Sequence, residues 1–88
     1  MEVTSLIVAL REKGEAIRKR ELEKTLATLK DLPPHAQKAI EALSASITNK
    51  LLHPPIVYLK NSSKSGKSQE SAATEVVRRI FALDEEEE

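Results

Sequence analysis

Two adjacent prolines interrupt an apolar run in the second half of the chain and restrict what that segment can form. Residues 47–52 have the spacing of an amphipathic helix, and Pro54 and Pro55 follow directly. A proline lacks the backbone N–H that a helix interior needs, and its ring clashes with the preceding turn. Proline is nevertheless well suited to the first turn of a new helix. The sequence therefore predicts that one helix ends near residue 52 and a short one begins at Pro54, with a fixed bend between two apolar segments.

The rest of the chain also has a helical pattern. Residues 3–30 contain no proline and are rich in Leu, Glu, Lys, Arg and Ala, which favour helix. Two prolines at residues 33 and 34 indicate a stop and a restart, so a second helix is expected over 34–52. Residues 61–68 have the composition of a flexible polar loop, and a last helix is expected over 69–83. We predict an all-α helical bundle with one long N-terminal helix, a second and third helix bent at the prolines, and a C-terminal helix.

Composition limits the chain to one small domain. It has 88 residues, of which 40% are hydrophobic and only 2% aromatic, so the core must consist of Leu, Ile, Val and Ala. The absence of Cys excludes disulfides, thiolate metal sites and thiol nucleophiles. The first ten residues lack the basic start and small-residue cleavage site of a secretory signal, and no apolar run approaches the ~18 residues of a membrane span. We expect a soluble, cytoplasmic protein without a membrane partner.

The formal net charge of zero conceals an acidic end. Residues 84–88 hold five of the 14 acids, which leaves nine acids against 14 bases, a net charge of +5, in the rest of the chain. Terminal acidic runs are usually solvated. We therefore expect a helical domain over residues 1–83 and an acidic tail over residues 84–88.

The predicted helices differ in length, and this difference indicates self-association. At 1.5 Å per residue, the first helix would span about 40 Å and the second only about 28 Å. The shorter helix could not cover the whole apolar side of the longer one. A two-fold axis would let two copies bury the same surplus surface, so we expect a homodimer. The residues predicted at its interface are Leu6, Leu10, Ile17, Leu43, Ile47, Leu51 and Ile56.

No set of residues predicts a reaction centre. Residues 65–68 have the end of a phosphate-loop pattern, but the required earlier glycine is replaced by Asn61. His35 and His53 are the only histidines, and zinc needs three or four ligands. Basic residues between 11 and 24 alternate with Glu and lack aromatic neighbours, which favours a solvated face over RNA contact. We predict no catalytic, cofactor-binding or metal-binding residue in this chain.

Several short motifs together resemble a known family, the C-terminal dimerisation domain of glutamyl-tRNA reductase. The resemblance covers nearly the whole chain. The motifs are Leu10-Arg11, Ile17-Arg18, Glu21–Lys24, Leu43, Ile47–Pro55 and Arg78–Asp84.

The resemblance implies a role in assembly within a larger oxidoreductase. The parent enzyme of this family uses NADPH to reduce the glutamyl group of glutamyl-tRNA to glutamate-1-semialdehyde, in tetrapyrrole (porphyrin, haem and chlorophyll) biosynthesis. Its catalytic and NADPH-binding domains would precede this segment, so the chain would be a fragment of that enzyme and non-catalytic by itself. The resemblance transfers no active-site residue and no cofactor to it, and tight binding of glutamyl-tRNA is not expected.

Two alternatives remain open from the sequence. The chain could be a stand-alone helical adaptor or regulatory domain with a different partner. It could also be a helical RNA-binding module that uses the basic side of its first helix.

Overall fold

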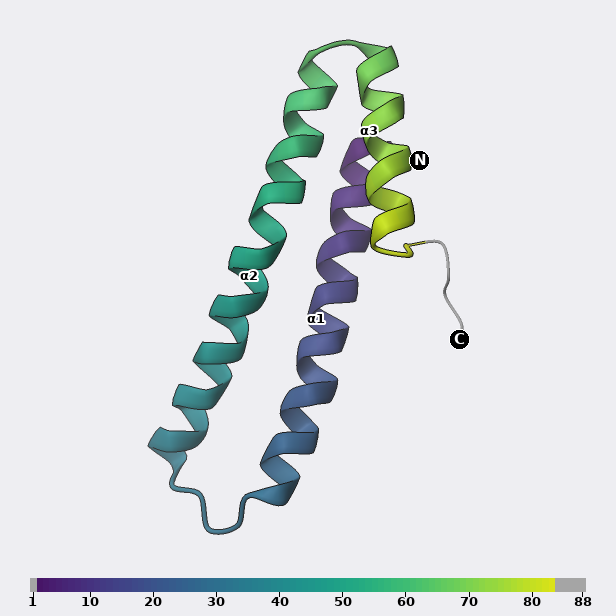
Figure 1. Ribbon diagram of the computed structural model, residues 1–88. Coiled ribbons are helices and arrows are strands. Elements are labelled where there is room, and N and C mark those ends of the chain that lie inside the picture. The colour runs from purple at the N-terminus through teal and green to yellow at the C-terminus, as the bar shows by residue number, and fades with distance from the viewer. Residues whose placement is uncertain (1, 84–88) are drawn as a thin grey trace.

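The described part of the chain is built from helices. A computed structural model describes residues 2–83, and within that range it contains three α-helices and no β-strand. Helices α1 (Val3–Thr28) and α2 (Pro34–Lys64) form a long antiparallel hairpin, and α3 (Lys67–Ile80) folds back beside one end of it (Figure 1). The predicted all-α helical bundle is confirmed. The acidic tail predicted at residues 84–88 lies outside the described residues.

The turn between α1 and α2 lies where the sequence predicts a stop. α1 ends at Thr28, and Leu29 has extended backbone angles (φ −102°, ψ 117°). Asp31 has a positive φ of 59°, which Asp tolerates better than most residues. Pro33 is extended, and Pro34 is the first residue of α2, where a missing N–H removes no helical hydrogen bond. The two prolines therefore fix both the path of the turn and the start of α2.

The predicted break at the second pair of prolines is wrong, because α2 continues from Pro34 to Lys64. Pro54 and Pro55 leave the carbonyls four residues earlier without their helical donors, and a proline inside a helix costs ~3 kcal/mol or more. Packing on both sides of the pair offsets this cost, since Leu52 before it and Ile56 after it are buried in the same core. Tertiary contacts thus keep α2 continuous at a position where the local sequence favours a break.

The relative lengths of the helices also differ from the prediction. α2 has 31 residues and α1 has 26, which correspond to about 46 Å and about 39 Å. The second helix is therefore the longer one, and the argument that it cannot cover the first fails. Any uncovered apolar surface must have another origin.

The serine-rich segment predicted as a loop over residues 61–68 is mostly helical. α2 extends to Lys64 and α3 begins at Lys67, so only Ser65 and Gly66 connect them. Gly66 has a φ of +112°, which side-chain-bearing residues rarely adopt. A glycine here allows the chain to reverse within two residues.

The last helix is present as predicted but is displaced by two or three residues at each end, beginning at Lys67 and ending at Ile80. It ends because Ala82 takes a positive φ of 53°. The N–H of Ala82 donates to the carbonyl of Arg79 (3.2 Å), and that of Leu83 donates to the carbonyl of Arg78 (3.0 Å). This pair of bonds is the Schellman cap, which satisfies the last carbonyls of a helix.

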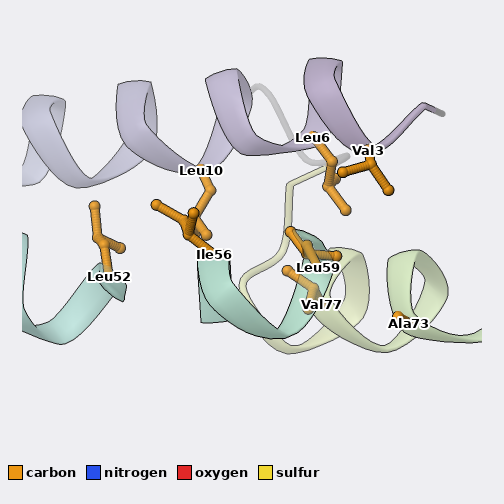
Figure 2. Packing of buried hydrophobic residues seen from close by; sticks show 8 residues of the cluster. All are labelled: Val3, Leu6, Leu10, Leu52, Ile56, Leu59, Ala73 and Val77. Carbon is orange, nitrogen blue, oxygen red and sulfur yellow. The ribbon is translucent and has the colours of Figure 1, made fainter. Parts of the chain in front are cut away.

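One hydrophobic core lies at the end of the hairpin that α3 covers (Figure 2). All three helices contribute to it, and none of residues 11–51 is fully buried. Residues 14–28 of α1 and 34–51 of α2 therefore form an open half of the hairpin, where two helices face each other without a third. Two helices cannot enclose their apolar side chains on all sides. The core residues are Val3, Leu6, Leu10, Leu52, Ile56, Leu59, Ala73 and Val77.

A polar contact joins α1 and α2 within the open half. Arg18 Nη1 donates to Ser44 Oγ across the hairpin (3.1 Å), while the same guanidinium pairs with Glu15 on its own helix. The hydrogen bond from Arg18 lowers the pKa of the Glu15 carboxyl below its usual value of 4.5. On α3, the pKa of the Glu75 carboxyl is likewise lowered by Arg78 and Arg79.

Because the pKa values of the Glu15 and Glu75 carboxyls are lowered, we predict that the free energy of unfolding falls in acid. Because their pKa is lower in the folded chain than in the unfolded one, their contribution is fully present above the usual value of 4.5 and is lost as the pH falls through the lowered pKa. We expect the midpoint of urea unfolding to fall as the pH is lowered from about 5 to about 3. The change should be small, because both carboxylates are only partly buried and solvent screens their ion pairs. The variant E15Q/E75Q should lose part of this pH dependence, and an unchanged dependence would contradict the assignment.

Candidate interaction surface

Four large apolar side chains lie exposed on the open half of the hairpin. Ile17 on α1 and Leu43, Ile47 and Leu51 on α2 have 45%, 60%, 51% and 69% of their surface accessible. The three on α2 are four residues apart, so they lie in line on one side of the helix, and the half-buried Ile40 continues the line. We call Ile40, Leu43, Ile47 and Leu51 the α2 stripe. An aligned set of this kind, unlike scattered apolar residues, marks an interaction surface.

The structure separates the seven predicted interface residues into two groups. Leu6, Leu10 and Ile56 are 0%, 1% and 3% exposed and belong to the core of the single chain. We therefore correct their assignment, because a buried side chain has no surface left to offer a second copy. The other four are Ile17 and the three exposed members of the α2 stripe, and these stay candidates.

Two adjoining hollows run along this side of the hairpin and form one apolar groove. The first has a volume of about 220 Å³ and the second about 420 Å³, and both are lined by Ile17 and Thr48. The first is completed by Leu10, Lys13, Gly14, Leu51, Leu52 and Phe81. The second is completed by Arg18, Glu21, Leu22, Thr25, Ile40, Leu43, Ser44 and Ile47.

A glycine in the wall of the groove brings α1 and α2 close together. A Cβ atom on Gly14 would lie only 2.8 Å from Leu52 Cδ1, closer than real Cβ contacts come. A side chain at position 14 would therefore require the end of the Leu52 side chain to shift. The sequence contains this signal. Gly14 stands between Leu10 and Ile17, four residues after the one and three before the other, where an apolar side chain would be expected and would favour the helix more.

The C-terminal turn of α3 closes one end of the groove. Phe81 lines the first hollow beside Leu10 and Ile17. Lys13 Nζ donates to the carbonyl of Ala82 (3.1 Å), which ties this turn to α1. Sequence reasoning missed Lys13 and Phe81, since they are 68 positions apart and nothing local indicates that they meet.

The groove has the chemistry of a packing surface. Within residues 2–83, no three His, Cys, Asp or Glu side chains lie together as a metal site, and His35 and His53 are both exposed. The pKa shifts of Glu15, Arg18 and Glu75 arise mainly from ion pairs within single helices, and Glu41 on α2 adds a smaller contribution at Arg18. In the part of the chain that the structure describes, no helix combines the length and the hydrophobicity needed to cross a membrane.

A helical hairpin with an exposed apolar groove defines a helical interaction domain. The sequence model of the family described as "Glutamyl-tRNAGlu reductase, dimerisation domain" matches residues 1–83. The chain belongs to this family, and the resemblance inferred from its motifs is confirmed.

Curated relatives agree with this membership. The chain is 49% identical over 86 residues to the glutamyl-tRNA reductase of Geobacter sulfurreducens, a match that covers 98% of the chain and 19% of the relative. It is 51% identical over 83 residues to that of Geobacter metallireducens, with 94% of the chain and 19% of the relative covered. The reductase of Thermodesulfovibrio yellowstonii is 42% identical over 88 residues, which cover 100% of the chain and 20% of the relative. The chain thus spans about a fifth of the length of these proteins. No solved structure matches it significantly.

Proposed function

We propose that this chain is the homodimerisation module of a glutamyl-tRNA reductase and that it joins two copies through the groove and the α2 stripe. One observation carries the proposal: a member of this dimerisation-domain family leaves Ile17, Leu43, Ile47 and Leu51 exposed along one side of its hairpin. A second copy buries the same set of residues on both chains, as a two-fold axis requires.

A comparison of burial energy with the cost of association supports an interface larger than these four residues. Burying a Leu or Ile side chain completely is worth about 1.5–3 kcal/mol, so eight half-exposed side chains in a dimer contribute roughly 6–12 kcal/mol. Association costs an estimated ~4–15 kcal/mol in lost translational and rotational freedom. These eight side chains alone would therefore only balance that cost. A stable dimer also needs the rest of the groove to be filled.

The parent protein, in this proposal, is the NADPH-dependent oxidoreductase that converts glutamyl-tRNA to glutamate-1-semialdehyde for tetrapyrrole biosynthesis in the cytoplasm. Its catalytic and NADPH-binding domains belong to the same polypeptide and precede the region that corresponds to this chain. The chain contributes assembly, while the substrate and NADPH bind to those other domains. Family membership and the similarity to glutamyl-tRNA reductases support this assignment.

Light scattering combined with size-exclusion chromatography tests the proposal directly. At micromolar concentration and physiological salt, we expect a mass of twice the 9.8 kDa of one chain. The mass should stay the same on moderate dilution if the groove is filled. A mass of one chain under these conditions would contradict the proposed function.

A further inference from the structure

We propose that the hairpin contains a joint at the level of Gly14, Pro54 and Pro55, where its open half bends relative to the end that contains the core. The joint belongs to the single chain and does not depend on the proposed homodimer. It is a conformational device of the fold, because it sets the angle between the core and the open half, which carries the candidate interaction surface. Three features of the described residues coincide at this level.

The first feature is a loss of helical hydrogen bonds in α2. Pro54 and Pro55 lie inside the helix, and they leave the carbonyls of Lys50 and Leu51 without a helical donor. Because each helical N–H donates to the carbonyl four residues earlier, any section across an α-helix is crossed by about four such bonds. The section between Leu51 and Leu52 lacks two of them. This part of α2 therefore resists bending less than the rest of the helix.

The second feature is the position of Gly14 on α1. A Cβ atom there would lie 2.8 Å from Leu52 Cδ1 and 3.4 Å from Thr48 Cγ2, so this glycine faces α2 at the turn before its prolines. Glycine leaves a helix interior with more backbone freedom than any other residue. Both helices of the hairpin are therefore least restrained at the same height. A bend in one helix alone would separate the two at their contact, whereas two weak points at one level let both bend together.

The third feature is the limit of the three-helix part. The buried residues of α1 all lie at position 10 or earlier, and those of α2 all lie at position 52 or later. Lys13 Nζ donates to the carbonyl of Ala82 (3.1 Å), which holds the last turn of α3 to α1 one residue before Gly14. α3 lies beside only this end of the hairpin (Figure 1). A packed three-helix body thus changes to a two-helix one at the level of the joint.

Burial places the bend on the open side of the prolines. Leu52 and Ile56 are 9% and 3% exposed and belong to the core, so the proline pair between them moves with the core. Leu51 is 69% exposed and lies outside the core. The bend in α2 therefore falls between Leu51 and Leu52. Hinges of this kind are formed by a few residues that absorb the change in backbone angles.

Residual dipolar couplings test the joint, because they average over the microsecond-to-millisecond range in which collective hinge motions occur. They are measured for the backbone N–H groups of the whole isotope-labelled chain and fitted separately for the core end and the open half. We expect that no single alignment tensor fits both parts and that their degrees of order differ. In P54A/P55A, two restored N–H groups complete the hydrogen bonds of α2, and we expect this difference to be lost. P54A and P55A alone should each retain part of it.

P34A is the matched control, because Pro34 is the first residue of α2 and its ring removes no helical hydrogen bond. This variant should keep the wild-type difference. Equal degrees of order in the two parts of the wild-type chain would overturn the joint. A difference that persists in P54A/P55A, or that is lost in P34A, would overturn the assignment of the joint to the internal prolines. Light scattering of the same samples tests the homodimer separately, since a monomeric chain contradicts the proposed function whatever the couplings show.

Discussion

Replacing both Ile47 and Leu51 with Asp should convert the proposed dimer into a folded monomer. The two side chains are 51% and 69% exposed in the single chain, so aspartates at these positions stay hydrated in the monomer. In the dimer the same carboxylates would be removed from water without partners, which costs several kcal/mol each. Two substitutions per chain place four such groups in one interface. We expect Kd to rise by at least about a thousandfold, since each ~1.4 kcal/mol is a factor of ten.

Sedimentation velocity over a range of concentrations measures this loss, and circular dichroism shows whether the helices persist. Val8→Asp is the matched control, because Val8 is also exposed (49%) and apolar but does not line the groove. The control should keep the wild-type Kd. A double variant that still dimerises with the wild-type Kd would show that the interface lies on another face. Loss of helix in the double variant would show that these residues support the fold of the single chain.

Local sequence signals predicted the helices well where only local chemistry decides. The turn between α1 and α2 was predictable because the prolines at 33 and 34 leave no helical alternative. The second pair, Pro54 and Pro55, carries the same local signal but has the opposite outcome. There, Leu52 and Ile56 on either side are buried against the other helices and hold α2 together. The local sequence does not show that these contacts with distant residues will form.

The same limit explains the predicted loop at residues 61–68. Part of this polar segment continues α2 to Lys64, and the hydroxyls of Ser62 and Ser65 donate to the carbonyls of Tyr58 and Asn61 four residues earlier. Composition could indicate only that the segment is exposed and polar, which is true of a solvated helix end as well as of a loop. The glycine at position 66 was the informative residue, since it marks the point where the chain reverses.

The interface prediction was limited by the position of α3. Periodicity identifies apolar faces, but it cannot say which part of a face another helix of the same chain covers. Leu6 and Leu10 have the same spacing on α1 as Ile17, yet α3 covers the first two and ends before the third. The exposed surface therefore comes from the short reach of α3, and the predicted difference in length between the first two helices has no part in it.

Truncating Leu6 to Ala should destabilise the single chain far more than truncating Leu43. Leu6 is 0% exposed within the core, and a buried Leu→Ala change costs about 2–5 kcal/mol. Small proteins have a total stability of only about 5–15 kcal/mol, and an 88-residue chain lies toward the lower end. L6A should therefore populate unfolded chains at ordinary temperature. Leu43 is 60% exposed, so L43A should leave the unfolding of the monomer unchanged and weaken only the dimer.

Urea unfolding at two protein concentrations distinguishes the two effects. A dimer is stabilised by mass action, so its unfolding midpoint rises with protein concentration, whereas that of a monomer does not. L6A should lower the midpoint at both concentrations and keep this dependence. L43A should lower the midpoint mainly at the higher concentration, because at the lower one the chain is already dissociated. If L6A instead abolished the concentration dependence and left the monomer as stable as before, Leu6 would belong to the interface, and the division of the apolar face into a core covered by α3 and an open groove would be wrong.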